Sequence, residues 1–267
     1  MFFNKIKSYA KINLSLGVLG KHKSGLHKIE SLIVFIDLYD EIYIKEIKNK
    51  IHKIKFYGEF SKNIPKLNTV SKLLKILDKK NLLKDKKFFI KIKKKIPQMS
   101  GMGGGSMNAA NILNYLIKRK KIMIDTFSLT KICKEIGSDV IFGITKKMKI
   151  LREDGKYSSL KKKPNLYIIL LKPNFGCSTK SIYNSVSKYS KPNLRSNKHQ
   201  NILNELKNLK NDLETPAFKK YPLLLKIKNY LIKSPNIQFA RMTGSGSCIV
   251  GYFSTRKALL SAAKKIK

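Results

Sequence analysis

The sequence contains few cysteines and histidines and no long apolar run. Its three cysteines are far apart and form no Cys-x-x-Cys pair, so neither a disulfide framework nor a thiolate zinc site is expected. The four histidines show no His-Glu-x-x-His spacing, and no apolar run reaches the ~18 residues that a transmembrane helix needs. The first residues lead directly into a strand pattern without the apolar core of a signal peptide. These absences predict a cytoplasmic protein with reduced thiols and no membrane partner.

Acidic residues are also scarce, which leaves a large positive charge. Lysine and arginine total 57 against 16 aspartates and glutamates, giving a formal net charge of +41. This charge raises the hypothesis of a basic nucleic-acid-binding protein. Nearly all of it is lysine spread over the whole chain, whereas bidentate recognition of bases and phosphates favours clustered arginine. We therefore expect attraction of anionic metabolites but no specific nucleic-acid partner.

The most informative stretch is the glycine-rich segment from Pro97 to Ala110. Four glycines leave its backbone free to turn sharply and to bring N–H groups close to a ligand. A helical pattern follows at once, for which Ser106 is the expected N-cap. A glycine loop that runs into a helix N-terminus favours anions such as phosphate. The segment lacks the Gly-Lys-Ser/Thr of a Walker A loop and is not the Gly-x-Gly-x-x-Gly of dinucleotide sites.

The stretch from Tyr9 to Gly20 alternates apolar and polar residues and predicts a strand. Lys11, Asn13 and Ser15 then point to the same face. From the residues alone, this face could be an ordinary solvated edge or part of a site.

The remaining periodicities predict a mixture of strands and helices, which indicates an α+β protein. The division at the turn after Asp154-Gly155 predicts two domains, residues 1–155 and 156–267. Thr69 and Ser128 are expected to cap two helices, and Gly137 is expected to end the second of them. The expected strands are Ile29–Asp37, Asp40–Ile47, Ile51–Tyr57, Phe88–Lys95, a buried Tyr167–Leu171, Ile237–Ala240 and Cys248–Phe253, and the expected helices include Met107–Lys118 and Ala258–Ile266.

The glycine loop resembles the phosphate loop of the GHMP small-molecule kinases, which reads Pro-x-x-x-Gly-x-Gly-Gly-Gly/Ser-Ser. The stretches Gly137–Val140 and Met242–Gly246 are similar to further motifs of that superfamily. Ala10–Leu14 and Asn211–Glu214 look most like the 4-diphosphocytidyl-2-C-methyl-D-erythritol kinases within it. The resemblance implies the two-domain GHMP kinase fold, with an N-terminal mixed α/β domain that holds the phosphate loop and a C-terminal ferredoxin-like domain.

The resemblance also implies a reaction, which is transfer of the ATP γ-phosphoryl group to the 2-hydroxyl of a cytidine-diphosphate substrate in the non-mevalonate isoprenoid pathway. Asp139 is then the catalytic base and Lys11 its partner, while Asn13, His27, Thr179 and Tyr183 bind the substrate. Mg²⁺ is expected with ATP, without assigned ligands. The residues implied in ATP binding are Pro97, Gln98, Met99, Ser100, Gly101, Met102, Gly103, Gly104, Gly105, Ser106, Met107 and Asn108.

The sequence departs from the resemblance at one position. The family reads Asp-Gly-Tyr-His where this chain has Ser24-Gly25-Leu26-His27, so the tyrosine that stacks on cytosine is replaced by leucine. This difference keeps a second interpretation open, namely another GHMP kinase that acts on homoserine or a mevalonate. From the residues alone, Asp139 could also be a cap or turn residue, His27 a surface loop residue and Tyr183 a core residue.

Overall fold

A computed structural model describes residues 2–23, 25–159, 164–194 and 202–266. The chain forms two compact units, and both contain separate stretches of sequence. The first unit comprises Met1–Lys11, Phe35–Gln98 and Gly103–Lys146, and the second comprises Ile12–Val34, Met99–Met102 and Lys147–Lys267. This division differs from the expected one after residue 155 because two long strands each contribute residues to both units. No helix in the described part of the chain is long and apolar enough to cross a membrane.

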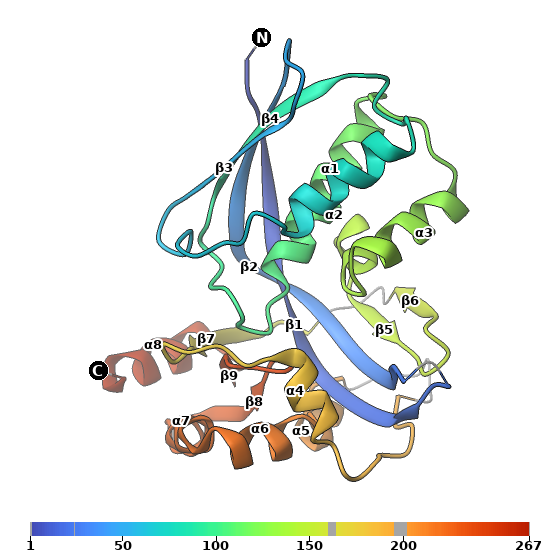
Figure 1. Ribbon diagram of the computed structural model, residues 1–267. Helices are drawn as coiled ribbons and strands as arrows, with labels where there is room; N and C mark the ends of the chain where they lie inside the picture. The colour runs from blue at the N-terminus through green and yellow to red at the C-terminus, as the bar shows by residue number, and fades with distance from the viewer. Residues whose placement is uncertain (1, 24, 160–163, 195–201, 267) are drawn as a thin grey trace. The chain divides into compact units, whose positions relative to one another are not determined.

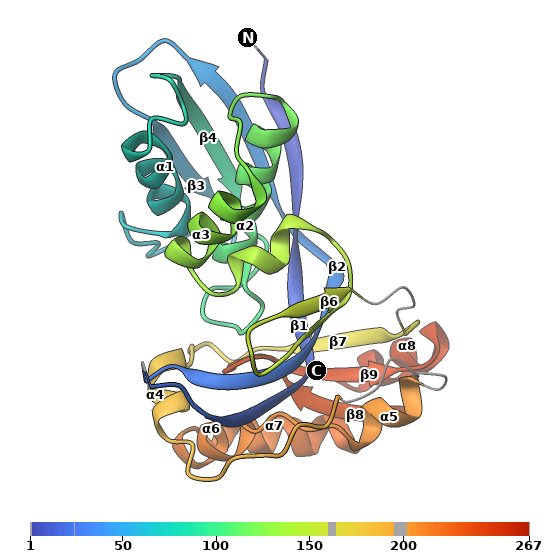
Figure 2. The ribbon, with the colours of Figure 1, turned by 90° about the vertical axis from the view of Figure 1, so that its right-hand side faces the viewer.

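The first unit is a sheet with helices on one face (Figures 1 and 2). β4 pairs with β2 in antiparallel fashion and with β3 in parallel fashion, and β1 pairs with β2. Helices α1, α2 and α3 cover the apolar face. The elements that contribute to this unit are β1 (Asn4–Lys21), β2 (His27–Ile47), β3 (Lys53–Tyr57), α1 (Thr69–Lys79), β4 (Lys87–Lys93), α2 (Gly104–Lys118), α3 (Thr126–Ile136) and the short 3₁₀ helix η1 (Val140–Ile144).

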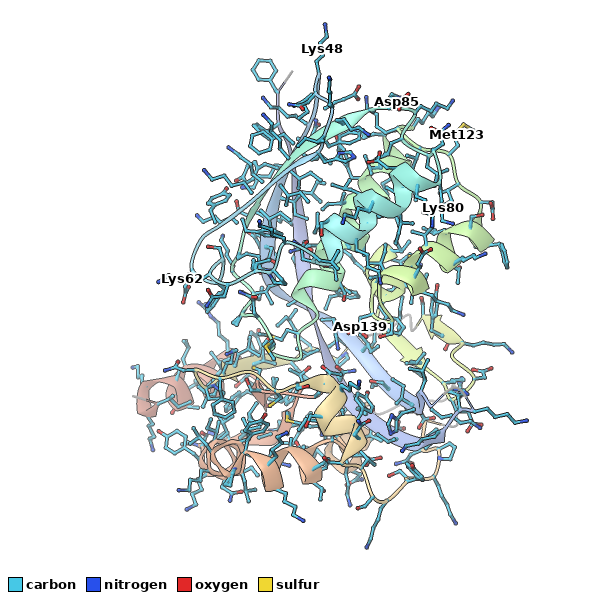
Figure 3. The ribbon with its side chains drawn as sticks, viewed as in Figure 1. Lys48, Lys62, Lys80, Asp85, Met123 and Asp139 are labelled. Carbon is cyan, nitrogen blue, oxygen red and sulfur yellow. The ribbon has the colours of Figure 1, made fainter. Side chains whose placement is uncertain are left out.

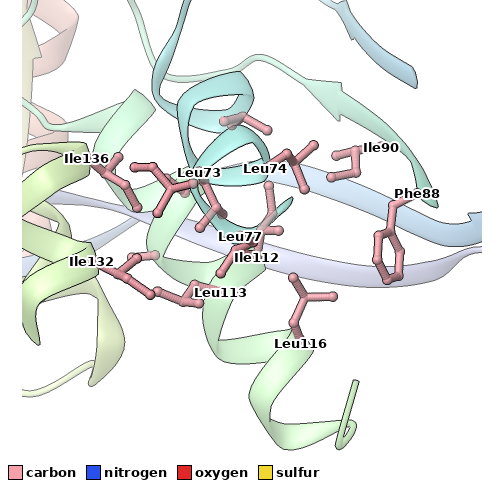
Figure 4. Packing of buried hydrophobic residues seen from close by; sticks show 14 of the residues in the cluster. Leu73, Leu74, Leu77, Phe88, Ile90, Ile112, Leu113, Leu116, Ile132 and Ile136 are labelled. Atoms are coloured by element: carbon pink, nitrogen blue, oxygen red, sulfur yellow. The ribbon is translucent and has the colours of Figure 1, made fainter. Parts of the chain in front are cut away.

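The core of the first unit follows from the two periodicities of the sequence. Successive side chains of a strand point to opposite faces, so Phe88, Ile90 and Ile92 of β4 are buried while Phe89 and Lys91 remain partly exposed. The helices place residues three and four apart on the same side and pack them against these strands (Figure 4). The helical residues of this cluster include Leu73, Leu74, Leu77, Ile112, Leu113, Leu116, Ile132 and Ile136.

β2 is one continuous strand, whereas the sequence predicted two, Ile29–Asp37 and Asp40–Ile47. No glycine or proline occurs between them, so the backbone can stay extended through Leu38 and Tyr39. Asp40, the first residue of the second predicted strand, is fully buried and accepts hydrogen bonds from backbone N–H groups of another segment. Its carboxylate is thus compatible with the interior of a strand.

Two predicted helix caps are wrong by one and three residues. α1 is capped by Asn68, whose side chain accepts from the N–H groups of Val70 and Ser71, rather than by Thr69. α3 is capped by Asp125, which accepts from the N–H of Ser128 at 2.9 Å. In both cases a better side-chain acceptor with extended backbone precedes the expected residue. The predicted end of α3 at Gly137 is confirmed.

His52 forms hydrogen bonds to both strand β4 and helix α1, and the bond to β4 requires its ring to be neutral. Its Nδ1 accepts a hydrogen bond from the backbone N–H of Phe88 at 3.0 Å, so the neutral ring carries its proton on Nε2, which lies 3.1 Å from Oδ2 of Asp78. Burial lowers the pKa of His52, and the Lys87 ammonium lowers it further, against the opposing effect of Asp78. The neutral form is therefore the one that the fold favours.

We expect the free energy of unfolding to fall as the pH drops below about 6.5, the pKa of an unfolded histidine. In that range the unfolded chain binds a proton at His52 that the folded chain binds only at lower pH, so acid favours unfolding. His52→Gln cannot take up this proton, and its unfolding free energy should change less between pH 7.5 and 5.5 than that of the wild type. Urea titrations at both pH values measure the difference, and equal slopes for the two proteins would contradict the assignment.

The second unit contains an antiparallel sheet in the order β7-β9-β8, together with the part of β2 that pairs with β5 and the part of β1 that belongs to this unit. β9 is fully buried, whereas every residue of β7 is only half-buried, so the prediction of a buried strand there is wrong. β7 is an edge strand, which explains its exposure. The further elements are β5 (Lys149–Leu151), β6 (Tyr157–Ser159), β7 (Tyr167–Leu171), α4 (Thr179–Asn184), α5 (Ile202–Asn208), α6 (Glu214–Lys220), α7 (Pro222–Ile232), β8 (Ile237–Met242), β9 (Ile249–Phe253) and α8 (Arg256–Lys265).

Candidate active site

Lys11 and Asp139 lie far apart in the sequence but meet in the first unit. The Nζ of Lys11 is 3.2 Å from Oδ2 of Asp139. The lysine side chain is only 6% exposed, while the carboxylate side chain is 36% exposed. The polar face of β1 is therefore buried and not a solvated edge, since Asn13 and Ser15 are buried as well. The pair combines a fixed positive charge with a carboxylate that a reactant can reach.

The local backbone presents Asp139 at the connection between α3 and η1, where Figure 3 labels it. α3 ends at Gly137, and Asp139 occupies the N-cap position of η1. Its side chain makes no capping hydrogen bond there. From the sequence, Asp139 could have been a helix cap. Its carboxylate does not cap η1 in the structure.

The glycine loop enters α2 through a left-handed residue. Gly103 has φ 66° and ψ 18° and is the N-cap, so α2 begins at Gly104 and the prediction of Ser106 as the cap is wrong. A glycine adopts this conformation without steric cost, which explains why the helix begins early. The first bond of the helix runs from the N–H of Met107 to the carbonyl of Gly103 at 2.9 Å. The N–H groups of Gly104, Gly105 and Ser106 precede it at the positive end of the helix dipole.

The glycines of this loop allow two close contacts with other parts of the first unit. A Cβ atom on Gly103 would lie 3.0 Å from Cγ and 3.1 Å from Cε of Lys11, so the stem of the lysine rests directly on the loop. A Cβ atom on Gly105 would lie 3.1 Å from Oγ1 of Thr69, which donates to the Gly105 carbonyl at 2.7 Å. Thr69 thus supports the loop, a role that the sequence did not indicate.

Three residues of the predicted ATP-binding loop turn their side chains into the protein. Gln98 donates to the carbonyls of Phe60 and Lys62 at 3.2 and 2.6 Å. Met107 is fully buried, and Asn108 is 1% exposed. These side chains shape the loop, whereas the backbone at Gly103–Ser106 offers the N–H groups.

The middle of the loop belongs to the second unit, where it is bonded to the turn between β8 and β9. The carbonyls of Met99 and Ser100 accept from the N–H groups of Ser247 and Cys248 at 3.2 and 3.3 Å. The hydroxyl of Thr243 donates to the carbonyl of Gly101 at 3.3 Å. The two glycine motifs that the sequence showed separately are therefore parts of one arrangement.

The Asn211–Glu214 motif builds this same turn. The amide of Asn211 donates to the carbonyls of Met242 and Gly244 at 2.7 and 2.8 Å, and Glu214 accepts from the N–H of Met242 at 2.7 Å. Asp212 accepts from the N–H of Val18 on β1 at 2.7 Å. In the sequence this motif showed only a resemblance to a family, whereas in the structure its side chains hold the turn in place.

Two of the predicted substrate residues, His27 and Tyr183, form an aromatic pair in the second unit. Their ring centroids are 5.1 Å apart with an interplanar angle of 40°. Burial and the nearby Lys21 lower the pKa of His27, which favours the neutral ring. Its buried Nε2 has no hydrogen-bond partner among the described residues. Leu26 is 70% exposed, and Ser24 of the same motif lies outside the described residues.

The other two predicted substrate residues, Asn13 and Thr179, also lie in the second unit. The amide of Asn13 donates to the hydroxyl of Ser31 at 2.7 Å, and its backbone N–H donates to Thr243 at 3.0 Å. Thr179 is exposed at the start of α4, with its hydroxyl 2.9 Å from that of Ser245. The predicted site residues thus form two groups: the Lys11–Asp139 pair with the helical end of the loop, and the four substrate candidates with Met99–Met102. Among the described residues no group of three or more His, Cys, Asp or Glu could hold a metal ion.

Comparison with known proteins shows to which family the chain is similar. Residues 68–147 match the family described as GHMP kinases N terminal domain. The chain is 56% identical to 4-diphosphocytidyl-2-C-methyl-D-erythritol kinase of Pelagibacter ubique (strain HTCC1062). The alignment covers 98% of this chain and 94% of the relative. The kinase of the same name from Clostridium botulinum (strain Langeland / NCTC 10281 / Type F) is 37% identical over 92% of this chain and 90% of its own.

Solved structures show the same fold. A crystal structure of 4-(cytidine 5'-diphospho)-2C-methyl-D-erythritol kinase superposes with a TM-score of 0.79 at 23% identity, covering 98% of this chain and 95% of the other. Homoserine kinase from Cytophaga hutchinsonii superposes with a TM-score of 0.66 at 16% identity, covering 100% of this chain and 90% of the other. The predicted α+β, two-domain GHMP kinase fold is confirmed. Given the identity over nearly the full length of the Pelagibacter protein, the chain belongs to the 4-diphosphocytidyl-2-C-methyl-D-erythritol kinase family of the GHMP kinases.

Proposed function

We propose that this chain transfers the γ-phosphoryl group of ATP to the 2-hydroxyl of 4-diphosphocytidyl-2-C-methyl-D-erythritol, a step of the non-mevalonate route to isoprenoid precursors. The observation that carries the proposal is the 3.2 Å pair of Lys11 and Asp139, with the lysine stem against the glycine loop. The names of the related kinases supply the identity of the acceptor.

In the proposed reaction the acceptor hydroxyl oxygen forms a bond to the γ-phosphorus, and the bond from that phosphorus to the bridging oxygen breaks to release ADP. Asp139 accepts the hydroxyl proton as the transfer proceeds. Lys11 orients the Asp139 carboxylate and offsets negative charge in the transition state. Phosphoryl transfer depends more on positioning and charge neutralisation than on covalent chemistry, which suits a site built from one carboxylate, one ammonium and backbone N–H groups.

The N–H groups of Gly104, Gly105 and Ser106 are the proposed cradle for the ATP phosphates, since they lie at the positive end of α2. Mg²⁺ with ATP would shield the phosphate charge. No protein ligand for this ion is assigned among the described residues.

The cytosine end of the acceptor is assigned to the second unit. His27 and Tyr183 present two adjacent rings against which a base can stack. Leu26 offers only apolar contact in place of the tyrosine expected from the family. Asn13 and Thr179 supply further polar groups for the acceptor.

The decisive experiment measures ADP formation with ATP and each candidate acceptor in turn. We expect turnover with 4-diphosphocytidyl-2-C-methyl-D-erythritol and background rates with homoserine and mevalonate. Phosphorylation of either of the latter at a higher kcat/KM would overturn the proposed acceptor and leave the kinase fold intact.

Tyr183→Ala should raise the KM for the cytidylyl acceptor by about 5- to 150-fold, because losing one aromatic stacking face costs roughly 1–3 kcal/mol. The KM for ATP should stay within about twofold, since ring stacking acts on the base alone. Tyr189, which is 49% exposed in the same unit, provides the matched control, and Tyr189→Ala should change neither constant. An unchanged acceptor KM in Tyr183→Ala would remove this residue from the site.

We also propose a cytoplasmic enzyme without a specific nucleic-acid or membrane partner. Cys133, Cys177 and Cys248 are free and buried, as suits a reducing compartment. Burial raises the pKa of Cys133 to about 11 and that of Cys248 to about 12, so both thiols are unreactive at neutral pH.

A further inference from the structure

Asp40 is a fully buried carboxylate on β2 that the proposed mechanism does not use. Its Oδ1 accepts from the backbone N–H groups of Lys95 and Ile96 at 2.8 and 2.9 Å. Its Oδ2 accepts from the amide of Asn108 at 2.9 Å and from the ammonium of Lys94. A buried carboxylate is costly unless donors surround it, and these four donors satisfy it.

These donors lie on the two sides of the glycine loop. Lys94, Lys95 and Ile96 are the last residues before Pro97, where the chain leaves β4 and enters the loop. Asn108 lies in α2, where the chain has left the loop. One carboxylate therefore fixes the distance between the entrance and the exit of the loop, and all five residues belong to the first unit.

Asp40 also offsets the positive charge of the buried Lys94 ammonium, which lies at the N-terminus of α2. Lys94 is 4% exposed, and a Cβ atom on Gly104 would lie 3.3 Å from its Nζ. An ammonium thus lies beneath the first residue of α2, where the helix dipole is itself positive. Without a carboxylate beside it, this ammonium would be expelled from its buried position and the start of the helix would shift.

We propose that Asp40 is a positioning residue for the phosphate loop, acting through Lys94 and Asn108 to hold the N–H groups of Gly104–Ser106 where they meet the ATP phosphates. It does not touch the nucleotide. This inference rests on the proposed function, because it requires that the loop binds ATP.

Two variants separate the contacts of Asp40. Asp40→Ala removes all of them. Asp40→Asn keeps an oxygen for the N–H groups of Lys95 and Ile96 but removes the charge that Lys94 needs. Asn108 can adapt to this change, because its Oδ1 has no partner among the described residues and a rotated amide could accept from the nitrogen of the introduced side chain. Asp40→Asn is thus the variant more certain to fold.

Asp78 provides a matched control in the same unit. Its carboxylate also bonds to a lysine and a second side chain, with Nζ of Lys87 at 2.9 Å and Nε2 of His52 at 3.1 Å, but none of its partners borders the loop. Asp78→Asn therefore removes a contact with a lysine and one with a second side chain without touching the loop. A merely structural role for Asp40 predicts that the two variants behave alike.

The experiment measures Kd for ATP by calorimetry, KM for ATP and for the acceptor, and the urea midpoint of every variant. Asp40→Asn should raise Kd and KM for ATP by about 10- to 100-fold, since small displacements of positioning groups have effects of this size. Acceptor KM should change less than about twofold, because no loop amide binds the acceptor. Asp78→Asn should lower the urea midpoint and leave ATP binding unchanged.

The outcomes distinguish this inference from the proposed function. Wild-type protein that fails to bind ATP would refute the function itself. If the wild type binds ATP and the folded Asp40→Asn variant binds it equally well, the positioning role alone is refuted. Equal increases in ATP KM for Asp40→Asn and Asp78→Asn would also refute it, because the effect would then follow from lost stability.

Discussion

Asp139→Asn is expected to lower kcat by on the order of 10²–10⁴, the range over which a positioned proton acceptor contributes to catalysis. Asparagine keeps the shape of the side chain but cannot take up the acceptor's proton. ATP binding should remain nearly intact, because the carboxylate is assigned to the acceptor hydroxyl and not to the nucleotide. Steady-state kinetics with both substrates, together with calorimetric ATP binding, measure the two effects separately.

Lys11→Met should reduce kcat to a similar extent, and the double variant should be little worse than either single one. The reason is that the ammonium holds the carboxylate at 3.2 Å and offsets charge in the same transition state, so the two residues work as a unit. Additive losses in the double variant would indicate independent roles instead.

Asp154 and Lys156 provide a matched control for this pair. Their side chains form an ion pair at 3.2 Å, the same distance as between Lys11 and Asp139, but the lysine there is 86% exposed. Asp154→Asn should leave kcat unchanged, because exposed ion pairs contribute little. Near-normal turnover in Asp139→Asn would rule out the mechanism.

Gly101→Ala is expected to destabilise the protein by about 2–4 kcal/mol and to abolish most ATP-dependent turnover, because it combines backbone strain with overpacking. Gly101 has φ 75°, and an added Cβ atom would overlap the backbone carbonyl oxygen of Thr243. That oxygen belongs to the backbone and cannot move without displacing the turn after β8. Urea denaturation and the KM for ATP measure the two consequences.

Gly155 separates the two causes of this effect. It has φ 76°, and a Cβ atom there would meet nothing within 4 Å. Gly155→Ala should therefore show only the cost of the left-handed backbone, about 1 kcal/mol, and retain activity. If the two alanine variants were equally stable and equally active, the contact between the loop and Thr243 would have no energetic importance.

Much of the fold could be predicted from the sequence because its causes are local. The alternation of β4 and the helical spacing of α1 and α2 determine which side chains become buried, independently of what they meet. The errors lie where local signals compete. Thr69 is a good cap, but Asn68 before it is a better acceptor, and the strand that was expected to end at Asp37 continues through Asp40, whose backbone donors come from the segment after β4.

From the sequence, the residues of the candidate site could be predicted but not the contacts between them. The glycine loop and the resemblance of Gly137–Val140 to a superfamily motif named Asp139, but by themselves the residues allowed a cap there. The structure adds the 3.2 Å contact with Lys11 and the absence of a capping bond, which together favour a catalytic carboxylate.

The sequence by itself determined the kind of loop, the faces of the strands and helices, and the family to which the chain is similar, because each depends on residues close together in the chain. Only the tertiary structure decided what the remaining motifs do. Gly101 must be glycine because of the Thr243 carbonyl, Asn211 holds a turn made by Met242 and Gly244, and Asp40 joins the two sides of the loop. These contacts join residues that are distant in sequence, and the pattern of neighbours along a chain does not specify which distant groups the folded backbone brings within bonding distance.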